Sequence, residues 1–313
     1  MQVSDRIGRR MKLHDLHVLM AVAQAGSMNK AAARLNTRQS AISRSIADLE
    51  RTIGVQLLDR NPQGVEPTEY GRALLDGGAA MFDELREAVK KIEFLADPTT
   101  GEVRIGCSPF LATSFVSAAV DRLTQRYPRI VLYVVPTQTD ALHLGLRERN
   151  FDLAITWRLG PFADEQLGFE TLYDDSFVVL AGAQNAWVRR RKIEFAQLVN
   201  ETWVLPPPES SNASVYMEAF RANGLGYPRA TVFTDPAEMR ISLVATGRFL
   251  TIIPASSILR FPTRRSELKI LPVKLPLARV PIGVATLKNR TLGPVAQLFI
   301  QHAREVAKSR TRR

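Results

Sequence analysis

Hydrophobic residues recur every three or four positions in three short segments near the start of the chain, residues 13–25, 29–35 and 39–53. This spacing places them on one face of an α-helix, so the pattern predicts three amphipathic helices. The turn between the second and third helices, Asn36-Thr37, is so short that the two must cross steeply instead of lying side by side. Gly54 follows the third helix, where glycine can adopt the left-handed conformation that ends a helix. The pattern is typical of a helix-turn-helix.

The outward face of the third helix carries small and polar side chains, with Ile42 and Ile46 on the opposite face. Such a face fits the major groove of DNA and can hydrogen-bond to the edges of base pairs. The stretch 59–65 contains a proline and a glycine between two short extended pieces, which predicts the wing of a winged helix. The candidate DNA-binding residues on the third helix and the wing are Arg38, Gln39, Ser40, Ser43, Arg44 and Arg60.

A fourth helical pattern is much longer and runs from Thr68 to about Ala96. Its apolar stripe consists of Met81, Leu85, Val89 and Ile92, extended upstream by Leu74, Leu75 and Gly78. A small N-terminal domain offers too little surface to cover this stripe, so we expect the helix to pair with the same helix of a second subunit. The alternative is that the stripe packs against the chain's own C-terminal domain.

After the long helix, apolar runs alternate with helical segments. Strands are predicted at 103–107, 130–136 and 151–156, with helices between them. This βαβ order predicts a parallel sheet covered by helices. A similar unit begins near Leu172, and the chain ends with a strand at 281–287 and a helix that returns to the first unit. The predicted fold class is therefore α/β, with an all-α winged helix-turn-helix at the N-terminus.

This organisation predicts three parts, joined by a hinge at 97–101. They are a DNA-binding domain at 1–67, a linker helix for dimerisation at 68–97, and a two-lobed domain at 98–313, with lobe I at about 102–160 and 270–308 and lobe II at about 161–269.

The net charge of +11 is partly concentrated near the N-terminus, where residues 1–65 hold ten Lys and Arg against five Asp and Glu. Positive charge of this kind favours polyanions through counterion release. The single cysteine, Cys107, excludes an intrachain disulfide and fits a reducing compartment; we interpret it as a buried residue at a strand end and not as a sensor. No apolar stretch approaches the roughly 20 residues of a membrane span. We therefore expect a cytoplasmic protein without membrane contact.

Candidate ligand-binding residues follow the predicted strands of both lobes. In open α/β lobes, ligands bind where strand ends and helix N-termini face the cleft, and the free N–H groups there favour an anionic group. Each hydroxyl could instead cap its own helix, and the arginine of this set could form a surface ion pair. The candidate effector-binding residues are Ser108, Pro109, Thr137, Gln138, Thr139, Arg158, Ser210, Ser211 and Asn212.

Catalytic chemistry has little support in the sequence. The four histidines are scattered, and the chain has no nucleophile elbow, phosphate-binding loop, dinucleotide-binding glycine motif or metal-spaced set of Cys and His. We therefore expect no enzymatic activity, no cofactor and no metal. A receptor that only binds a small solute is the alternative, but such a receptor would not need residues 13–65.

The run from Ala25 to Arg60 resembles the DNA-binding domain of LysR-type transcriptional regulators. The residues that match the family pattern are Gly26, Ser27, Ala31, Ala32, Leu35, Gln39, Ala41, Ile42, Ser43, Leu49, Glu50, Gly54, Leu57 and Arg60. Further family landmarks are 101–106, 126–128, 151–155, 243–247 and Pro254. The resemblance thus covers essentially the whole chain.

The resemblance implies a C-terminal domain similar to type II periplasmic binding proteins, with a small-molecule effector held between its lobes. It also implies a homodimer or homotetramer bound to an imperfect inverted repeat in double-stranded DNA, with RNA polymerase as a further candidate partner. From the residues themselves, we expect the effector to carry an anionic or hydroxyl-rich group.

The sequence departs from the family pattern at two positions of the third helix, Arg38 where Ser is usual and Ser40 where Pro is common. Without a hydroxyl at position 38, either Thr37 takes over as the helix cap or Arg38 reaches a phosphate of the DNA. The family's wing usually carries a second basic residue near Gln63 and a further one near Glu66. Their absence predicts fewer phosphate contacts from the wing, with Arg60 as the main one.

Overall fold

A computed structural model gives the fold. It describes residues 11–61, 64–158, 165–210, 213–228, 232–258, 266–275 and 279–311. The chain separates into two compact units, Met1–Val89 and Lys90–Arg313, each considered by itself below.

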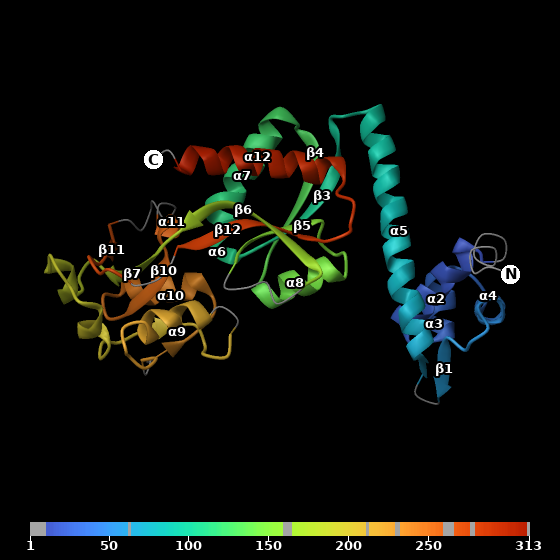
Figure 1. Ribbon diagram of the computed structural model, residues 1–313, viewed down its shortest axis with the longest axis horizontal. Coiled ribbons are helices and arrows are strands. Elements are labelled where there is room, and N and C mark those ends of the chain that lie inside the picture. Colours follow the sequence, from blue (N-terminus) through green and yellow to red (C-terminus); the bar gives the residue numbers. More distant parts are fainter. Residues whose placement is uncertain are drawn as a thin grey trace. The chain divides into compact units, whose positions relative to one another are not determined.

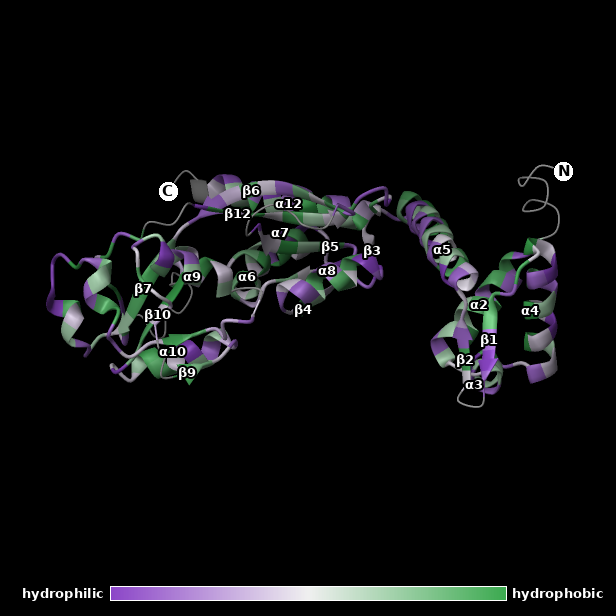
Figure 2. Ribbon diagram, turned by 60° about the horizontal axis from the view of Figure 1, so that its bottom comes forward, coloured by the Kyte–Doolittle hydropathy of each residue, from purple (hydrophilic) through white to green (hydrophobic). Residues whose placement is uncertain are grey.

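The N-terminal unit contains the predicted winged helix-turn-helix (Figure 1). Its elements are α2 (Leu13–Ala25), α3 (Met28–Arg34), α4 (Gln39–Ile53), the antiparallel strands β1 (Leu58–Asn61) and β2 (Gly64–Pro67), and the first part of α5 (Glu69–Ala96). Leu19, Ile46 and Leu49 are fully buried in its core, because the apolar faces of three helices meet there. Gly54 ends α4 in the left-handed conformation with φ 90°. Because only one face of α4 lies in this core, hydrophobic and hydrophilic bands alternate along the helix (Figure 2).

The apolar side of α5 divides into two parts. Leu74, Leu75 and Phe82 are partly buried against the core of the N-terminal unit. The proposed upstream extension of the stripe therefore belongs to an intrachain contact. The side chains further along remain exposed, and they are Met81, Leu85, Val89, Ile92 and Leu95.

The first lobe of the C-terminal unit is built on a five-stranded sheet in the order β4-β3-β5-β12-β6. The strands are β3 (Thr100–Cys107), β4 (Arg129–Pro136), β5 (Leu153–Trp157), β6 (Leu167–Asp175) and β12 (Val280–Leu287). The predicted parallel pairing holds for β3, β4 and β5. Strand β12, for which no direction was predicted, is antiparallel to both neighbours because the chain returns from the second lobe and enters the sheet from the opposite end.

Helices cover both faces of this sheet (Figure 1). They are α6 (Pro109–Leu111), which continues through the π-helical turn η1 (Ala112–Val116) into α7 (Ser117–Arg126), then α8 (Thr139–Arg147) and α12 (Pro294–Thr311). Helices α7 and α12 pack together on one face, and α8 packs on the other. Val103, Ile105 and Phe115 are fully buried between these layers.

The second lobe has two smaller sheets. They contain β7 (Phe177–Gly182), β10 (Leu250–Pro254) and β11 (Leu268–Ile270) in one antiparallel sheet, and the parallel pair β8 (Val204–Leu205) and β9 (Val232–Phe233) in the other. They pack with the helices α9 (Ala213–Arg221), α10 (Ala237–Ala245) and α11 (Ala255–Ile258) and the 3-10 turns η2 (Ala186–Arg189) and η3 (Phe195–Leu198). Trp203 is fully buried at the centre and donates its indole N–H to the carbonyl of Leu198 at 2.8 Å.

The crossing between lobes lies later in the chain than the predicted boundary at residue 161. Strand β6 pairs with β12 in the first sheet, so the chain leaves lobe I only at Asp175. The Asp175 carboxylate accepts hydrogen bonds from the N–H of Ser176 and, at 2.5 Å, from the hydroxyl of Ser256. The sequence did not predict β6, because β6 is an edge strand and its exposed residues interrupt the apolar pattern.

The end of α5 is tied to the C-terminal unit, although we expected a hinge there. Phe94 packs against the core of this unit, and Arg129 forms an ion pair with Asp97 at 2.8 Å. Hydrogen bonds from the Thr99 hydroxyl and N–H, and then the charge of Arg129, hold the pKa of Asp97 below its ordinary value. These contacts restrain the segment predicted to be a free hinge.

Candidate functional site

The exposed face of α4 brings together the polar residues that the sequence singles out for DNA contact. Gln39 donates a side-chain hydrogen bond to the Ser43 hydroxyl at 3.0 Å, one turn further along the helix. Arg38, Ser40 and Arg44 line a shallow hollow beside them. Hydrogen-bonding groups on an exposed helix face are the kind of surface that reads base edges in the major groove.

The start of α4 settles which residue takes the capping position. Arg38 is the N-cap, and no side chain makes a capping hydrogen bond there. The N–H of Thr37 instead donates to the carbonyl of Ala32, at the end of α3. The Arg38 side chain is therefore left exposed beside the positive end of the helix, where a phosphate would be favoured.

The wing is a short hairpin in which Arg60 on β1 pairs with Val65 on β2. Arg60 is exposed. Gln63, where the family usually has a basic residue nearby, lies outside the described residues.

A cavity of about 380 Å³ lies between the two lobes of the C-terminal unit. Four predicted effector-binding residues line it from lobe I, namely Ser108, Pro109, Thr137 and Gln138. They meet there because β3 and β4 are parallel neighbours, so their carboxyl ends lie at the same edge of the sheet. The volume is within the range that holds a small organic molecule.

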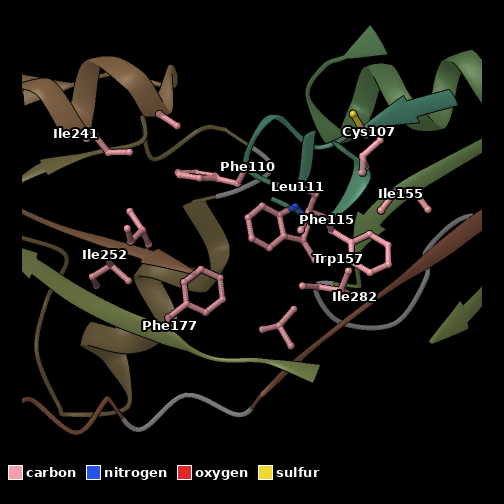
Figure 3. Close-up of a cluster of buried hydrophobic side chains, with 14 of the residues drawn as sticks. Cys107, Phe110, Leu111, Phe115, Ile155, Trp157, Phe177, Ile241, Ile252 and Ile282 are labelled. Carbon is pink, nitrogen blue, oxygen red and sulfur yellow. The ribbon is translucent and has the colours of Figure 1, made fainter. Parts of the chain in front are cut away.

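Four aromatic residues line the cavity, namely Phe110, Trp157, Phe177 and Tyr216, and the first three are labelled in Figure 3. The ring of Trp157 lies 6.0 Å from those of both Phe110 and Phe177. Its indole N–H donates to the Ser108 hydroxyl at 2.6 Å, which fixes the orientation of the indole. The sequence indicated Ser108 as a ligand contact, and its hydroxyl also positions this wall.

The lobe II wall contains a cation that sequence reasoning missed. Arg240 on α10 is only 3% exposed, and its guanidinium carbon lies 5.4 Å from the ring centres of both Phe110 and Tyr216. A signal was present in the sequence, because Arg240 lies three residues after Ala237 and four before Val244. Both of these are buried core positions, so helical spacing places an arginine on an apolar face.

Three of the other predicted effector residues, Thr139, Arg158 and Ser210, are not among the described residues that line the cavity. Thr139 is the first residue of α8, and Arg158 is exposed with its guanidinium over the ring of Phe169 at 5.6 Å. The Ser210 hydroxyl is buried and has no hydrogen-bond partner within the described ranges. Ser211 and Asn212 lie outside the described residues.

Cys107 is fully buried at the end of β3, and desolvation raises its thiol pKa to about 12. Because the thiolate is the reactive species, almost none is present near neutral pH. We expect the native protein not to react with iodoacetamide at pH 7.5, and to react fully once unfolded in guanidinium. Mass spectrometry of the native and unfolded samples tests this. Rapid labelling of the native protein would show that the thiol is accessible and ionised.

In the part of the chain that the structure describes, no helix is long and apolar enough to span a membrane. In the same part, no group of three or more His, Cys, Asp or Glu is arranged to hold a metal ion.

Models of known protein families match both the N-terminal and the C-terminal unit of the chain. Residues 13–72 match the family model described as a bacterial regulatory helix-turn-helix protein of the lysR family, and residues 96–308 match that of the LysR substrate binding domain. The regulator GbpR of Azospirillum brasilense is 27% identical over 97% of this chain and 89% of its own length.

Solved structures of full-length regulators share the fold. A cysteine variant of full-length OxyR from Pseudomonas aeruginosa superposes with a TM-score of 0.68 at 20% identity, covering 95% of this chain and 97% of that one. CbnR in complex with its target DNA gives 0.56 at 21% identity, covering 95% and 100%. Because the two family models together account for nearly the whole chain, the protein belongs to the LysR family of DNA-binding transcriptional regulators.

Proposed function

We propose that this regulator binds an imperfect inverted repeat in double-stranded DNA as a homodimer or homotetramer, and that a small anionic molecule in the inter-lobe cavity controls it. The observation that supports this most strongly is that one chain has both an exposed polar face on α4 and a separate cavity between the lobes. Neither an enzyme nor a simple solute receptor would need the polar face of α4. Binding to DNA would make the cytoplasm its place of action, with RNA polymerase as a candidate partner.

In the proposed complex, α4 lies in the major groove and the wing follows the backbone. Gln39 and Ser43 are the base-reading residues, because their amide and hydroxyl groups can both donate and accept. Arg38, Arg44 and Arg60 supply phosphate contacts, which give affinity and orientation but little sequence preference. The hydrogen bond between Gln39 and Ser43 holds the reading groups in place before DNA arrives.

The effector acts in this proposal through the lobes. The cavity has walls from both, Ser108 and Thr137 on one side and Tyr216 and Arg240 on the other. A molecule that contacts both walls favours the arrangement of lobes in which both contacts are made, and can shift the equilibrium only by that difference in affinity. The restrained end of α5 would carry the change towards the DNA-binding unit.

Alanine substitutions in α4 and the wing test the assignment of roles. We expect Gln39→Ala and Ser43→Ala to relax sequence preference at one or two base pairs, by about 1–3 kcal/mol for a lost base contact. Arg60→Ala should instead weaken all sequences alike and reduce the slope of log K against log salt by about one. Selection of binding sites from a random DNA library, followed by titrations at several salt concentrations, measures both quantities.

The opposite pattern would contradict the proposal. If Arg60→Ala changed base preference while Gln39→Ala and Ser43→Ala left it intact, the roles of helix and wing would be reversed. If the purified protein selected no common DNA sequence, the proposed function itself would be wrong.

A further inference from the structure

The cavity wall contains a buried positive charge, the guanidinium of Arg240, that has no ion-pair partner among the described residues. The side chain of Arg240 ends in a guanidinium cation, and it is almost completely removed from solvent. Its Nε and Nη1 atoms are buried and make no hydrogen bond to any residue that the structure describes, although the side chain lies in the cavity wall. Burial of an unpaired charge is strongly unfavourable. Such a group is kept where a ligand of opposite charge can pair with it.

The nearest acidic residues in the wall do not take that role. Asp235 and Glu238 both line the cavity, but in the described part of the chain neither forms an ion pair with Arg240. They lie at the start of α10, where negative charge is favoured by the helix dipole. Arg240 is thus the one cation among the described residues of the wall, and the two carboxylates disfavour a ligand with more than one negative charge.

The apolar surfaces indicate the rest of the ligand. The rings of Trp157 and Phe177 stack at 6.0 Å with an angle of 16° between their planes, and Tyr216 meets Phe177 edge to face. Offset and edge-to-face contacts of this kind extend readily to one more aromatic ring. A guanidinium also matches the planar geometry of a carboxylate, with two parallel hydrogen bonds.

We propose that the effector is a small aromatic monocarboxylate, whose carboxylate pairs with Arg240 and whose ring packs against Trp157 and Phe177. This inference rests on the proposed function, in which the same cavity binds the effector. It adds the chemical class of the molecule and identifies Arg240 as the residue that selects for it.

The competing interpretation is structural. The guanidinium between Phe110 and Tyr216 could simply hold the two rings together through cation–π contacts. The two interpretations predict opposite effects in the absence of ligand. Arg240→Met removes an unpaired buried charge while keeping an unbranched side chain, so we expect it to raise the melting temperature of the ligand-free protein. A structural clamp would require the melting temperature to fall.

Ligand probes test the chemical class on the wild-type full-length protein. The probes are phenylacetate, 3-phenylpropanoate and indole-3-acetate, each with its uncharged amide, and phenyl phosphate as the doubly charged comparison. We expect millimolar carboxylate to raise the melting temperature and to change the fluorescence of Trp157, which forms part of the wall. The amides and the phosphate should have much smaller effects. Trp157→Phe should remove the fluorescence change and show that it arises in the cavity.

Substitutions at Arg240 test whether this residue binds the carboxylate. Arg240→Met and Arg240→Gln should each weaken carboxylate binding about 10- to 100-fold, as expected for loss of a charged hydrogen-bonded pair, and should abolish the preference for acid over amide. Arg248→Met is the matched control, because Arg248 also stacks on an aromatic ring, Phe249 at 5.4 Å, but is exposed and outside the cavity wall. It should bind carboxylates as the wild type does.

Three results would overturn the inference. They are equal binding of acids and amides by the wild type, undiminished carboxylate binding by both Arg240 variants, and no response to any probe. Each of these leaves the proposed function intact if the same protein preparation still selects a common DNA sequence. Loss of that DNA selectivity in the wild type would instead remove the function on which the inference rests.

Discussion

Leu85→Asp is expected to convert the full-length protein to a monomer with greatly reduced affinity for its DNA site. Leu85 lies at the centre of the exposed stripe on α5 and is 50% exposed in the single chain. Its neighbours one turn away on either side, Met81 and Val89, are exposed as well. A continuous apolar stripe on a 28-residue helix is typical of a helix that pairs with another helix. A charge at the centre of the stripe would lie in the apolar interface between the two paired helices.

The expected magnitude follows from burial and symmetry. Full burial of a leucine side chain contributes about 1.5–3 kcal/mol, and dimerisation can bury only the half of Leu85 that is exposed in the single chain. In a symmetric dimer the substitution acts twice, so the lost burial alone should cost the interface about 1.5–3 kcal/mol, or roughly one to two powers of ten in the dissociation constant, and the buried carboxylates add to this cost. Binding to an inverted repeat would fall with it, because two linked half-site contacts would be replaced by one.

Two variants separate the interface from other effects of the substitution. Lys91→Asp introduces the same side chain at an exposed position of α5 outside the stripe, and Leu85→Met keeps an apolar side chain within it. Both should remain dimeric in sedimentation and bind the DNA site. If Leu85→Asp were itself still a dimer at micromolar concentration, dimerisation would have to use a different surface, and the role assigned to Met81, Leu85, Val89 and Ile92 would be wrong.

The sequence predicted the N-terminal unit well because its structure is determined by local signals. Helical spacing, the short turn at Asn36-Thr37 and the left-handed Gly54 all act within a few residues. The lobes depend on pairings between distant segments. Periodicity in β12 does not reveal that it inserts between β5 and β6 in the reverse direction, since strand direction depends on where the chain comes from.

The candidate site likewise has one wall that local signals predict and one wall that depends on contacts between distant segments. Ser108, Thr137 and Gln138 were predictable because parallel strands β3 and β4 end at one edge of the sheet. The opposite wall comes from α9 and α10, and its position depends on how lobe II closes over lobe I. Arg240 could have been noticed as a charge on an apolar face, but nothing in the sequence says which cavity that face adjoins. Thr139 and Ser210 are not among the described lining residues, because a position near the start of a helix does not determine which way the hydroxyl points.

The second large effect concerns Gly283, at an irregularity in the pairing of β12 with β6. The register shifts between Ile282 and Gly283, which leaves Leu172 of β6 without an opposite residue, as in a β-bulge. A Cβ atom on Gly283 would lie 2.0 Å from the carbonyl oxygen of Glu170 and 2.7 Å from the ring of Phe169. The first neighbour is backbone, so it can move only if the two strands separate.

We expect Gly283→Ala to destabilise the C-terminal unit by about 3 kcal/mol, near the upper end of the usual cost of overpacking. For a unit of this size the melting temperature should fall by roughly 6–12 °C. Gly168→Ala is the matched control on the same pair of strands. Its Cβ would meet nothing closer than 3.6 Å, so the substitution should change the melting temperature little.

Calorimetry of the full-length protein should show the fall in only one transition, because the core of the N-terminal unit is separate from that of the lobes. The effect should also reach the regulatory response. Strands β6 and β12 are the ones through which the chain leaves lobe I and returns to it, so a distortion between them alters how lobe II is held over the cavity. Gly283→Ala should therefore weaken the binding of carboxylate probes while the winged helix-turn-helix retains its fold. A melting temperature equal to that of Gly168→Ala would mean that the bulge can absorb a methyl group, and that the close approach of β12 to β6 does not constrain the lobes.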